Sequence, residues 1–248
     1  MKVLRNPPLT PYLGPYDLTT GVCSEEVFRK LEQQLPRTAF RQWTGLPALS
    51  GKAEYRKLGM EVVPRRTFVL DLKQSKEDLW ANVYAKRRND IRKGEADLRI
   101  ESSFPELKVF MDWQRSAFEA KGKKYPYEHS FLHRVMEASR MHKASLALTA
   151  KDADGRQQAC VWLVFDHKCM YYLLGATSEK PHRGAVALLL WEAINRAKDM
   201  ELPFFDFEGS MDPDIADFFR RFGGQEQFYE ELQQTQSLLW KCKQWLLG

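Results

Sequence analysis

Apolar residues recur at helical spacing in six stretches of the chain, after a proline-rich opening at residues 6–16. Each proline biases the residue before it away from helix, so the opening is expected to be extended or turning. Ser24 and Ser75 resemble helix caps, because acidic residues follow each of them in the first turn. The predicted helices run from Ser24 to before Pro36, from Ser75 to about Gly94, from about Pro105 to Ala120, through Phe131 to Ser139, from Ala185 to Met200, and briefly after Asp212 and Pro213.

Short runs rich in β-branched and aromatic residues predict strands between these helices. The turn signals at residues 152–155 and 166–168 separate three of the runs and predict an antiparallel meander. A meander followed by helix, strand, helix and strand indicates an α+β fold with a mixed sheet. The predicted strands are Phe40–Trp43, Arg66–Leu72, Leu98–Glu101, Ser145–Ala150, Gln158–Phe165, Cys169–Gly175 and Pro203–Phe207, and Gln227–Leu247 is either two strands or a strand and an amphipathic tail.

Composition and charge narrow the class of protein but name no ligand. The 248 residues are 44% hydrophobic, which is enough for one large domain or two small packed ones. The net charge of +5 is unevenly spread, because residues 1–124 carry 24 basic and 16 acidic side chains whereas residues 125–248 carry 14 and 17. The basic half either attracts a polyanion or a phosphate-bearing ligand, or is only a solvated face.

Several classes of site and location are not expected. The longest apolar stretch, Ala185–Trp191, is far below the roughly 18 residues of a membrane span, and no signal-peptide core follows Met1, so we expect a cytoplasmic protein. His129 and His133 are four residues apart without a third ligand nearby, and no metal site is predicted. No nucleophile elbow, Walker loop or dinucleotide fingerprint occurs. The cysteines form no CxxC pair and indicate neither zinc nor a disulfide framework; they are Cys23, Cys160, Cys169 and Cys242.

A basic segment, Lys86–Lys93, lies on the predicted second helix. Trp80, Tyr84, Arg87 and Ile91 follow helical spacing, so Arg87 is expected on the face that points inward. A buried guanidinium needs a partner. That partner is either an internal carboxylate or an anionic substrate group held by two hydrogen bonds.

Two further segments could carry chemistry. The helix that begins at Ala185 has no acidic residue in its first turn and follows Arg183 and Gly184, so its start is either a phosphate cradle or an ordinary helix start. Strand alternation puts Asp206 and Glu208 on one face of the Pro203–Phe207 strand. These two carboxylates either serve chemistry or pair with nearby arginines.

Four segments, in this order, resemble the signature segments of the FemAB-like branch of the GNAT acyltransferase superfamily. They are Tyr171–Ser178, Leu188–Ile194, Phe205–Ser210 and Phe218–Gly224, and Arg88–Lys93 is similar to the basic helix that opens the acyltransferase domain of that family. The resemblance covers roughly residues 67–230. It implies an α+β fold with a GNAT-like mixed, mostly antiparallel sheet flanked by helices, in which two central strands part around the acyl donor. Residues 1–72 look like a partial first GNAT-like subdomain, and residues 73–248 look like the acyltransferase domain.

The resemblance implies an N-acyltransferase that moves an acyl or aminoacyl group from an activated donor to an amine on a small molecule or peptide. Glu208 is the first choice of base and Asp206 the second. The remaining implied site residues are Tyr172, Leu173, Leu174 and Gly175 for the backbone groups offered to the donor, Arg183, Gly184 and Ala185 for its phosphates, and Arg87, Arg88, Arg92, Ser210 and Arg220 for anionic substrate groups.

The donor implied by the resemblance is acyl-CoA or aminoacyl-tRNA, with no metal. A net charge of +5 favours acyl-CoA, because a tRNA acceptor stem would require a larger basic surface. A homodimer is left open. The competing hypothesis is a non-catalytic GNAT-fold module that binds nucleic acid or an anionic partner through its basic half.

Overall fold

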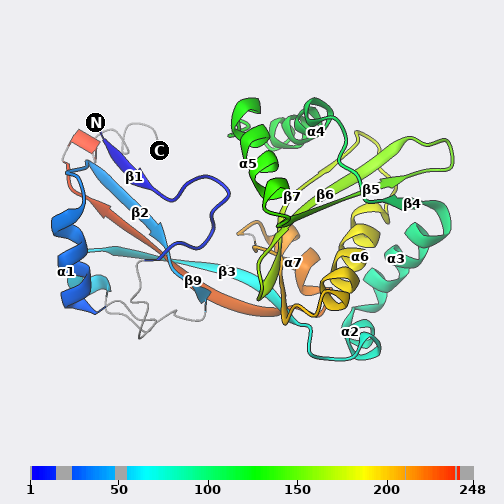
Figure 1. Cartoon of the computed structure of the whole chain (residues 1–248), viewed down its shortest axis with the longest axis horizontal. Helices are drawn as coiled ribbons and strands as arrows, with labels where there is room; N and C mark the ends of the chain where they lie inside the picture. The colour runs from blue at the N-terminus through cyan, green and yellow to red at the C-terminus, as the bar shows by residue number, and fades with distance from the viewer. Residues whose placement is uncertain (1, 15–23, 48–54, 210, 238, 241–248) are drawn as a thin grey trace. The chain divides into compact units, whose positions relative to one another are not determined.

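The chain folds into two compact units in a computed structural model that describes residues 2–14, 24–47, 55–209, 211–237 and 239–240 (Figure 1). The first unit comprises residues 1–67, 209–213 and 226–248, and the second comprises residues 68–208 and 214–225. The expected division into residues 1–72 and 73–248 therefore differs from the observed one at its C-terminal end. The last strand, β9 (Gln225–Thr235), returns to the first unit because it pairs with β2 (Phe40–Thr44).

The first unit is a small sheet with one helix. Its strands follow the order β1 (Val3–Arg5), β2, β9 and β3 (Glu61–Asp71), in which β1 and β2 are parallel and β2 and β9 antiparallel. Helix α1 (Glu25–Gln34) begins at Ser24, whose hydroxyl accepts a hydrogen bond from the backbone of Val27, as its sequence predicts. Phe28 of α1 is fully buried beside Trp43 and Leu232 and forms the core of this unit.

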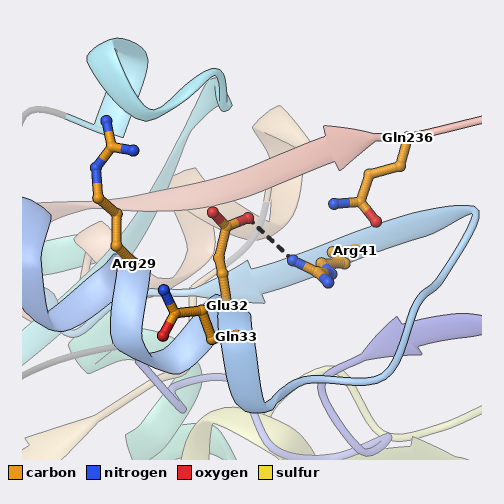
Figure 2. A pocket seen from close by; sticks show the side chains of 5 residues that line it. All are labelled: Arg29, Glu32, Gln33, Arg41 and Gln236. Carbon is orange, nitrogen blue, oxygen red and sulfur yellow. Dashed lines mark hydrogen bonds and ion pairs between the residues drawn. The ribbon is translucent and has the colours of Figure 1, made fainter.

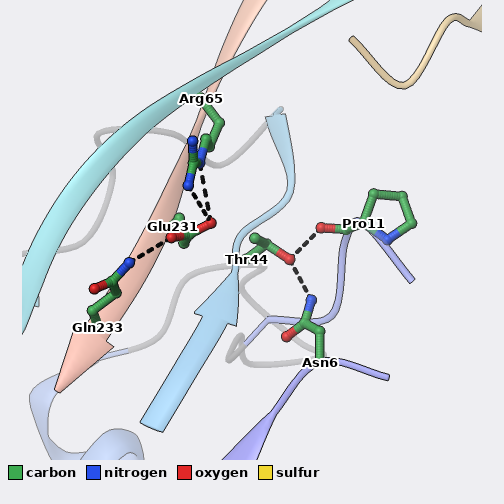
Figure 3. Close-up of polar contacts among 6 residues, drawn as sticks. All are labelled: Asn6, Pro11, Thr44, Arg65, Glu231 and Gln233. Atoms are coloured by element: carbon green, nitrogen blue, oxygen red, sulfur yellow. Dashed lines mark hydrogen bonds and ion pairs between the residues drawn. The ribbon is translucent and has the colours of Figure 1, made fainter. Parts of the chain in front are cut away.

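Polar side chains also tie the first unit together (Figure 3). Arg65 of β3 donates two hydrogen bonds to one oxygen of the buried Glu231 carboxylate, at 2.9 and 3.0 Å, and Gln233 donates to the other oxygen. Asn6 donates to the Thr44 hydroxyl, which in turn donates to the carbonyl of Pro11. Both networks join segments that are distant in the sequence.

The second unit holds the longer sheet, in which β3 is followed by β8, β7, β6, β5 and β4. Strands β7 and β8 are parallel and the other pairs are antiparallel. Its elements in chain order are α2 (Lys76–Asn82), α3 (Ala85–Asp97), β4 (Arg99–Glu101), α4 (Leu107–Glu119), α5 (His129–Met141), β5 (Ser145–Lys151), β6 (Gln157–Phe165), β7 (Cys169–Thr177), α6 (Ala185–Asp199), β8 (Phe204–Asp206) and α7 (Pro213–Arg220).

Helices cover both faces of this longer sheet (Figure 1). Val161 and Leu163 of β6 face the main core, which includes the buried side of α6, whereas Cys160 faces Phe110 of α4. The two faces therefore alternate along β6, as expected of a strand buried on both sides. The mixed, mostly antiparallel sheet flanked by helices confirms the predicted fold class.

The single helix predicted from Ser75 to about Gly94 is wrong, because two helices are separated at Val83 and Tyr84, whose backbones are extended. The backbone N–H of Tyr84 donates to the carbonyl of Arg221, which holds the break in place. The Tyr84 side chain is 54% exposed and does not point inward as the helical spacing predicted. The break reorients the helix, yet Arg87 is buried as expected.

An aromatic contact holds the C-terminal segment against β2. The ring of Trp240 stacks on Phe40 of β2 at 5.5 Å between ring centroids, which supports packing as the role of this tryptophan. Trp245 lies outside the described residues. Within the described ranges, no helix has both the length and the hydropathy that crossing a bilayer requires.

Candidate active site

The central feature of the second unit is the place where β7 and β8 stop pairing. The two parallel strands pair at only three positions, and the last pair is Tyr171 with Asp206. Strand β7 continues to Thr177, whereas β8 ends at Asp206. One edge of β7 beyond Tyr171 therefore has no β8 partner, and the two strands part there.

A β-bulge lies directly beyond this parting. Leu163 of β6 pairs with Tyr172 and Trp162 pairs with Leu174, so Leu173 is an extra residue in β7. Side-chain directions change accordingly, because Tyr172 packs against the α6 side of the sheet whereas Leu174 packs against the α4 side. A regular strand would place both on one face.

The bulge brings Tyr172 over Gly175. A side-chain carbon added at Gly175 would lie 1.8 Å from the Tyr172 hydroxyl oxygen, so a larger residue here would displace the Tyr172 ring. The carbonyl of Gly175 accepts a hydrogen bond from the Gln114 side chain at 3.3 Å. The four residues predicted to offer backbone groups to a donor, Tyr172 to Gly175, therefore form the bulged segment of β7 at the edge of the opening.

The two carboxylates lie at the end of β8. Asp206 is 4% exposed, and one of its oxygens accepts a hydrogen bond from the backbone N–H of Glu208 at 2.8 Å. Strand alternation does not relate them as predicted, because the strand ends at Asp206 and Glu208 has a left-handed backbone with φ of 54°. Gly209 also has positive φ, and the added carbon of any other residue there would lie 2.0 Å from the carbonyl oxygen of Arg66.

The surroundings of Glu208 favour its neutral form. Desolvation, and then the negative charge of Asp206, raise the pKa of Glu208 well above its ordinary value. Among the described residues, Glu208 forms no ion pair that would oppose this effect. A raised pKa makes the ionised carboxylate of Glu208 a stronger base, as general-base catalysis requires.

Two tyrosines of the α4–α5 connection also belong to this region, and sequence reasoning missed them. Burial, and then the charge of Glu208, raise the pKa of Tyr127. The ring of Tyr125 lies edge-on to that of Tyr127, and its hydroxyl donates to the Gln114 side chain at 2.6 Å. The only available signal was the pair of tyrosines around Pro126 after the Lys121–Lys124 loop, which spacing alone does not connect to β7 or β8.

The start of α6 is more crowded than its sequence suggested. A side-chain carbon at Gly184 would lie 2.3 Å from the backbone oxygen of Asp90 and 2.7 Å from the backbone nitrogen of Gly94, so α3 occupies the space beside Gly184. The backbone N–H of Gly184 donates to the His182 ring, and that of Ala185 donates to the His182 carbonyl. Phosphate binding by Gly184 and Ala185 stays a prediction, but the missing side chain of Gly184 serves helix packing.

Arg87 has the internal partner that was one of its two predicted alternatives. Its guanidinium lies 3.1 Å from the Asp90 carboxylate and 3.8 Å from the centre of the Phe218 ring, and the residue is 8% exposed. The other oxygen of Asp90 lies 3.1 Å from Arg183, whose side chain is 65% exposed. Arg87 is thus occupied within the protein, whereas Arg183 is open to solvent.

The other predicted substrate-binding residues are scattered. Arg88 donates to the carbonyls of Ala81 and Val83 at the end of α2, where a cation stabilises the helix terminus. Arg92 lies over the Trp80 ring at 5.6 Å, and Arg220 lies over the Phe68 ring at 5.2 Å. Ser210 lies outside the described residues.

Two cavities lie outside the segment where β7 and β8 part. One of about 630 Å³ lies between α4 and the ends of β6 and β7, where Trp113 and Gln158 contribute to its lining. Another of about 340 Å³ lies in the first unit, where the Arg41 guanidinium binds Glu32 at 3.0 Å (Figure 2). In the parts of the chain that the structure describes, no cluster of His, Cys, Asp or Glu is arranged to hold a metal ion.

Comparisons with known proteins agree with this arrangement. The family model described as an acetyltransferase (GNAT) domain matches residues 79–221. The crystal structure of FemX superposes with a TM-score of 0.60 at 13% identity, covering 71% of this chain and 66% of FemX. L-PGS from Bacillus licheniformis gives a TM-score of 0.54 at 13% identity, covering 88% of this chain and 74% of L-PGS.

No curated protein sequence matches the chain significantly. The structural similarity at such low identity concerns the fold, and the aligned part is just under two thirds of the FemX chain. The family match covers more than half of the chain and includes α3, the bulged β7, α6 and β8. The chain therefore belongs to the GNAT acetyltransferase family.

Proposed function

We propose that this protein transfers an acyl group from an acyl-CoA thioester to the amine of a small molecule or peptide. The observation that carries the proposal is the parting of β7 and β8 after Tyr171 and Asp206, with Glu208 next to the opening. The family match supports the reaction class, since GNAT domains are acyltransferases. Aminoacyl-tRNA is the second donor to be tested.

The chemistry requires one proton acceptor and a fixed geometry. The amine nitrogen attacks the thioester carbonyl carbon, so a carbon–nitrogen bond forms and the carbon–sulfur bond breaks. Glu208 in its ionised form accepts the proton that the nitrogen loses, and the departing thiolate takes up a proton from Glu208 or from water. Most of the rate comes from holding the two reactants together in the opening between the strands.

The positions of the cations suggest how the donor is oriented. Arg183 is the exposed cation at the start of α6, and we assign it to the donor phosphates. Its present partner is Asp90, which is also bound to Arg87. Because Arg87 neutralises Asp90 from within the protein, Arg183 can leave this carboxylate for a phosphate without exposing an unpaired buried charge.

The test replaces Glu208 by glutamine. Release of free thiol is measured with acetyl-CoA and a panel of amino acids, amino sugars and dipeptides as acceptors. Glu208→Gln should lower kcat by on the order of 10²-fold with nearly unchanged binding of acetyl-CoA, because the amide cannot accept the proton. Glu201→Gln, at an exposed position after α6, is the matched control and should retain wild-type activity.

Three outcomes would count against parts of this proposal. Unchanged kinetics of Glu208→Gln would transfer the role of base to Asp206 or to water. Turnover with aminoacyl-tRNA but not with acetyl-CoA would correct the donor. No turnover with either donor, together with an affinity for tRNA that falls steeply with salt, would favour a binding module instead of an enzyme.

A further inference from the structure

The Tyr172 hydroxyl lies over Gly175 of β7, just beyond the last β7–β8 pair, and has no partner among the described residues. In the part of the chain that the structure describes, no hydrogen bond involves this hydroxyl, whereas the nearby Tyr125 hydroxyl donates to Gln114. The residue is only partly exposed. A partly exposed phenol without a partner in the described part of the chain can bind water or a ligand.

The β-bulge in β7 determines the position of the Tyr172 hydroxyl. Tyr172 and Gly175 would lie on opposite faces of a regular strand, and the extra residue Leu173 places them on the same face. Gly175 then provides the space that the hydroxyl occupies, since an added side-chain carbon would lie 1.8 Å from the hydroxyl oxygen. Three features of β7 thus combine to hold one oxygen over the backbone just beyond the last β7–β8 pair.

Aromatic packing fixes the Tyr172 ring. Its ring lies edge-on to Phe219 of α7 at 5.9 Å, and Phe219 stacks on Phe207 at 5.1 Å. Phe207 directly follows β8, so Phe219 contacts the chain on both sides of the parting. The parallel register sets the backbone of residues 172–173 at the level of residues 207–208, so Tyr172 and Glu208 both follow directly on the last β7–β8 pair.

The environment also decides which role the hydroxyl can play. Desolvation raises the pKa of Tyr172, so the phenol keeps its proton throughout the neutral range. A phenol that holds its proton so strongly is a poor acid toward a thiolate. It remains a good hydrogen-bond donor to an alkoxide, which is the species that forms when an amine adds to a thioester.

We infer that the Tyr172 hydroxyl donates a hydrogen bond to the oxygen of the reacting carbonyl and stabilises the oxyanion of the tetrahedral intermediate. The inference rests on the proposed acyl transfer and adds a catalytic residue to it. The hydroxyl keeps its proton throughout the reaction. The carbonyl oxygen gains negative charge when the nitrogen adds. This charge is lost when the carbon–sulfur bond breaks and the carbonyl forms again.

The test is Tyr172→Phe, which keeps the ring and its packing on Phe219. With acetyl-CoA and the best acceptor of the panel, kcat should fall by on the order of 10²-fold while the KM for acetyl-CoA changes little, because the hydrogen bond strengthens only as charge develops. The melting temperature should stay the same or rise, because the hydroxyl has no internal partner to lose.

Tyr125→Phe is the comparison variant for stability. It removes the 2.6 Å hydrogen bond to Gln114 and should lower the melting temperature. A melting temperature of Tyr172→Phe that falls as much as that of Tyr125→Phe would assign the Tyr172 hydroxyl a structural role and overturn the inference. Wild-type kcat in Tyr172→Phe would overturn it as well.

The failure of this inference is separable from the failure of the proposed function. An active wild-type protein whose kcat is unaffected by Tyr172→Phe refutes only the oxyanion role. A wild-type protein without any acyl transfer refutes the proposed function and, with it, this inference. If kcat falls in Glu208→Gln but not in Tyr172→Phe, the result supports Glu208 as the general base and refutes the oxyanion role of the Tyr172 hydroxyl.

Discussion

At the level of single residues, the neighbouring acids Asp206 and Glu208 have different environments and different roles. Asp206 is the more buried, and its carboxylate holds the backbone N–H of Glu208, whereas Glu208 feels both desolvation and the charge of Asp206. The two effects act in the same direction on the pKa of Glu208. The acid limb of the pH–rate profile is therefore expected well above the range of an ordinary glutamic acid.

Asp206→Asn should move this acid limb to lower pH. The amide removes the negative charge that helps to raise the pKa of Glu208, while its oxygen can still accept the hydrogen bond from the Glu208 backbone. Glu208 then ionises at lower pH and becomes competent as a base there. The measurement is kcat/KM for acyl transfer as a function of pH; an acid limb that stays in place would show that Asp206 does not act on Glu208 through its charge.

The acids illustrate what the sequence could and could not predict about the site. Their types and their place after a buried strand made Asp206 and Glu208 candidates, and the inward position of Arg87 followed from helical spacing. The raised pKa of Glu208 depends on burial and on the charge of Asp206, and the position of Glu208 includes a left-handed turn of its own backbone. Such a turn at a non-glycine residue has no sequence signal strong enough to predict it.

At the level of elements, the contact between α3 and α6 is unusually close. Gly184 meets the backbone of Asp90 and Gly94, and an added carbon at Gly94 would lie 2.9 Å from the Leu188 side chain. Small residues at such a crossing let two helices approach without side chains between them. The start of α6, and with it the position of Arg183, is thereby set by α3.

Gly184→Ala should destabilise the protein by about 1–3 kcal/mol, because the new methyl group meets backbone atoms that cannot rotate away. Gly45→Ala is the matched control, since its added carbon meets one backbone oxygen at 3.5 Å and its φ is not positive. Thermal unfolding of both variants is the measurement. Equal stability of the two variants would mean that α3 moves aside readily.

The helices and strands follow from local sequence patterns, whereas two irregularities in them follow from contacts between segments distant in sequence. Capping serines, turn residues and hydrophobic periodicity predicted nearly every helix and strand among the described residues. The break between α2 and α3 depends on the carbonyl of Arg221, and the bulge of β7 depends on its register with β6. Both are set by partners remote in sequence, which a pattern along the chain does not contain.

At the level of the whole molecule, the free energy of unfolding should depend on pH through Glu208. Its pKa is raised in the folded state, so the folded protein holds this proton at pH values where the unfolded chain has lost it. The contribution of Glu208 to stability is complete below its unfolded pKa and is lost as pH rises through its folded pKa.

Glu208→Gln should therefore gain stability relative to the wild type as pH rises from about 4.5, because the amide has no charge to desolvate. Denaturant unfolding at several pH values up to 8 measures the difference, with Glu201→Gln as the exposed control. A constant difference between Glu208→Gln and the wild type over this range would mean that burial does not shift the pKa of Glu208.

The pairing of β9 with β2 affects the order in which the two units fold during synthesis. Strand β2 is complete once residue 44 has been synthesised, yet its antiparallel neighbour spans residues 225–235. A nascent chain emerging from the ribosome must carry β2 with one unpaired edge until residues 225–235 have been translated. Contacts this distant in sequence close slowly, so we expect the first unit to mature after the second and to be the part that relies on chaperones during biosynthesis.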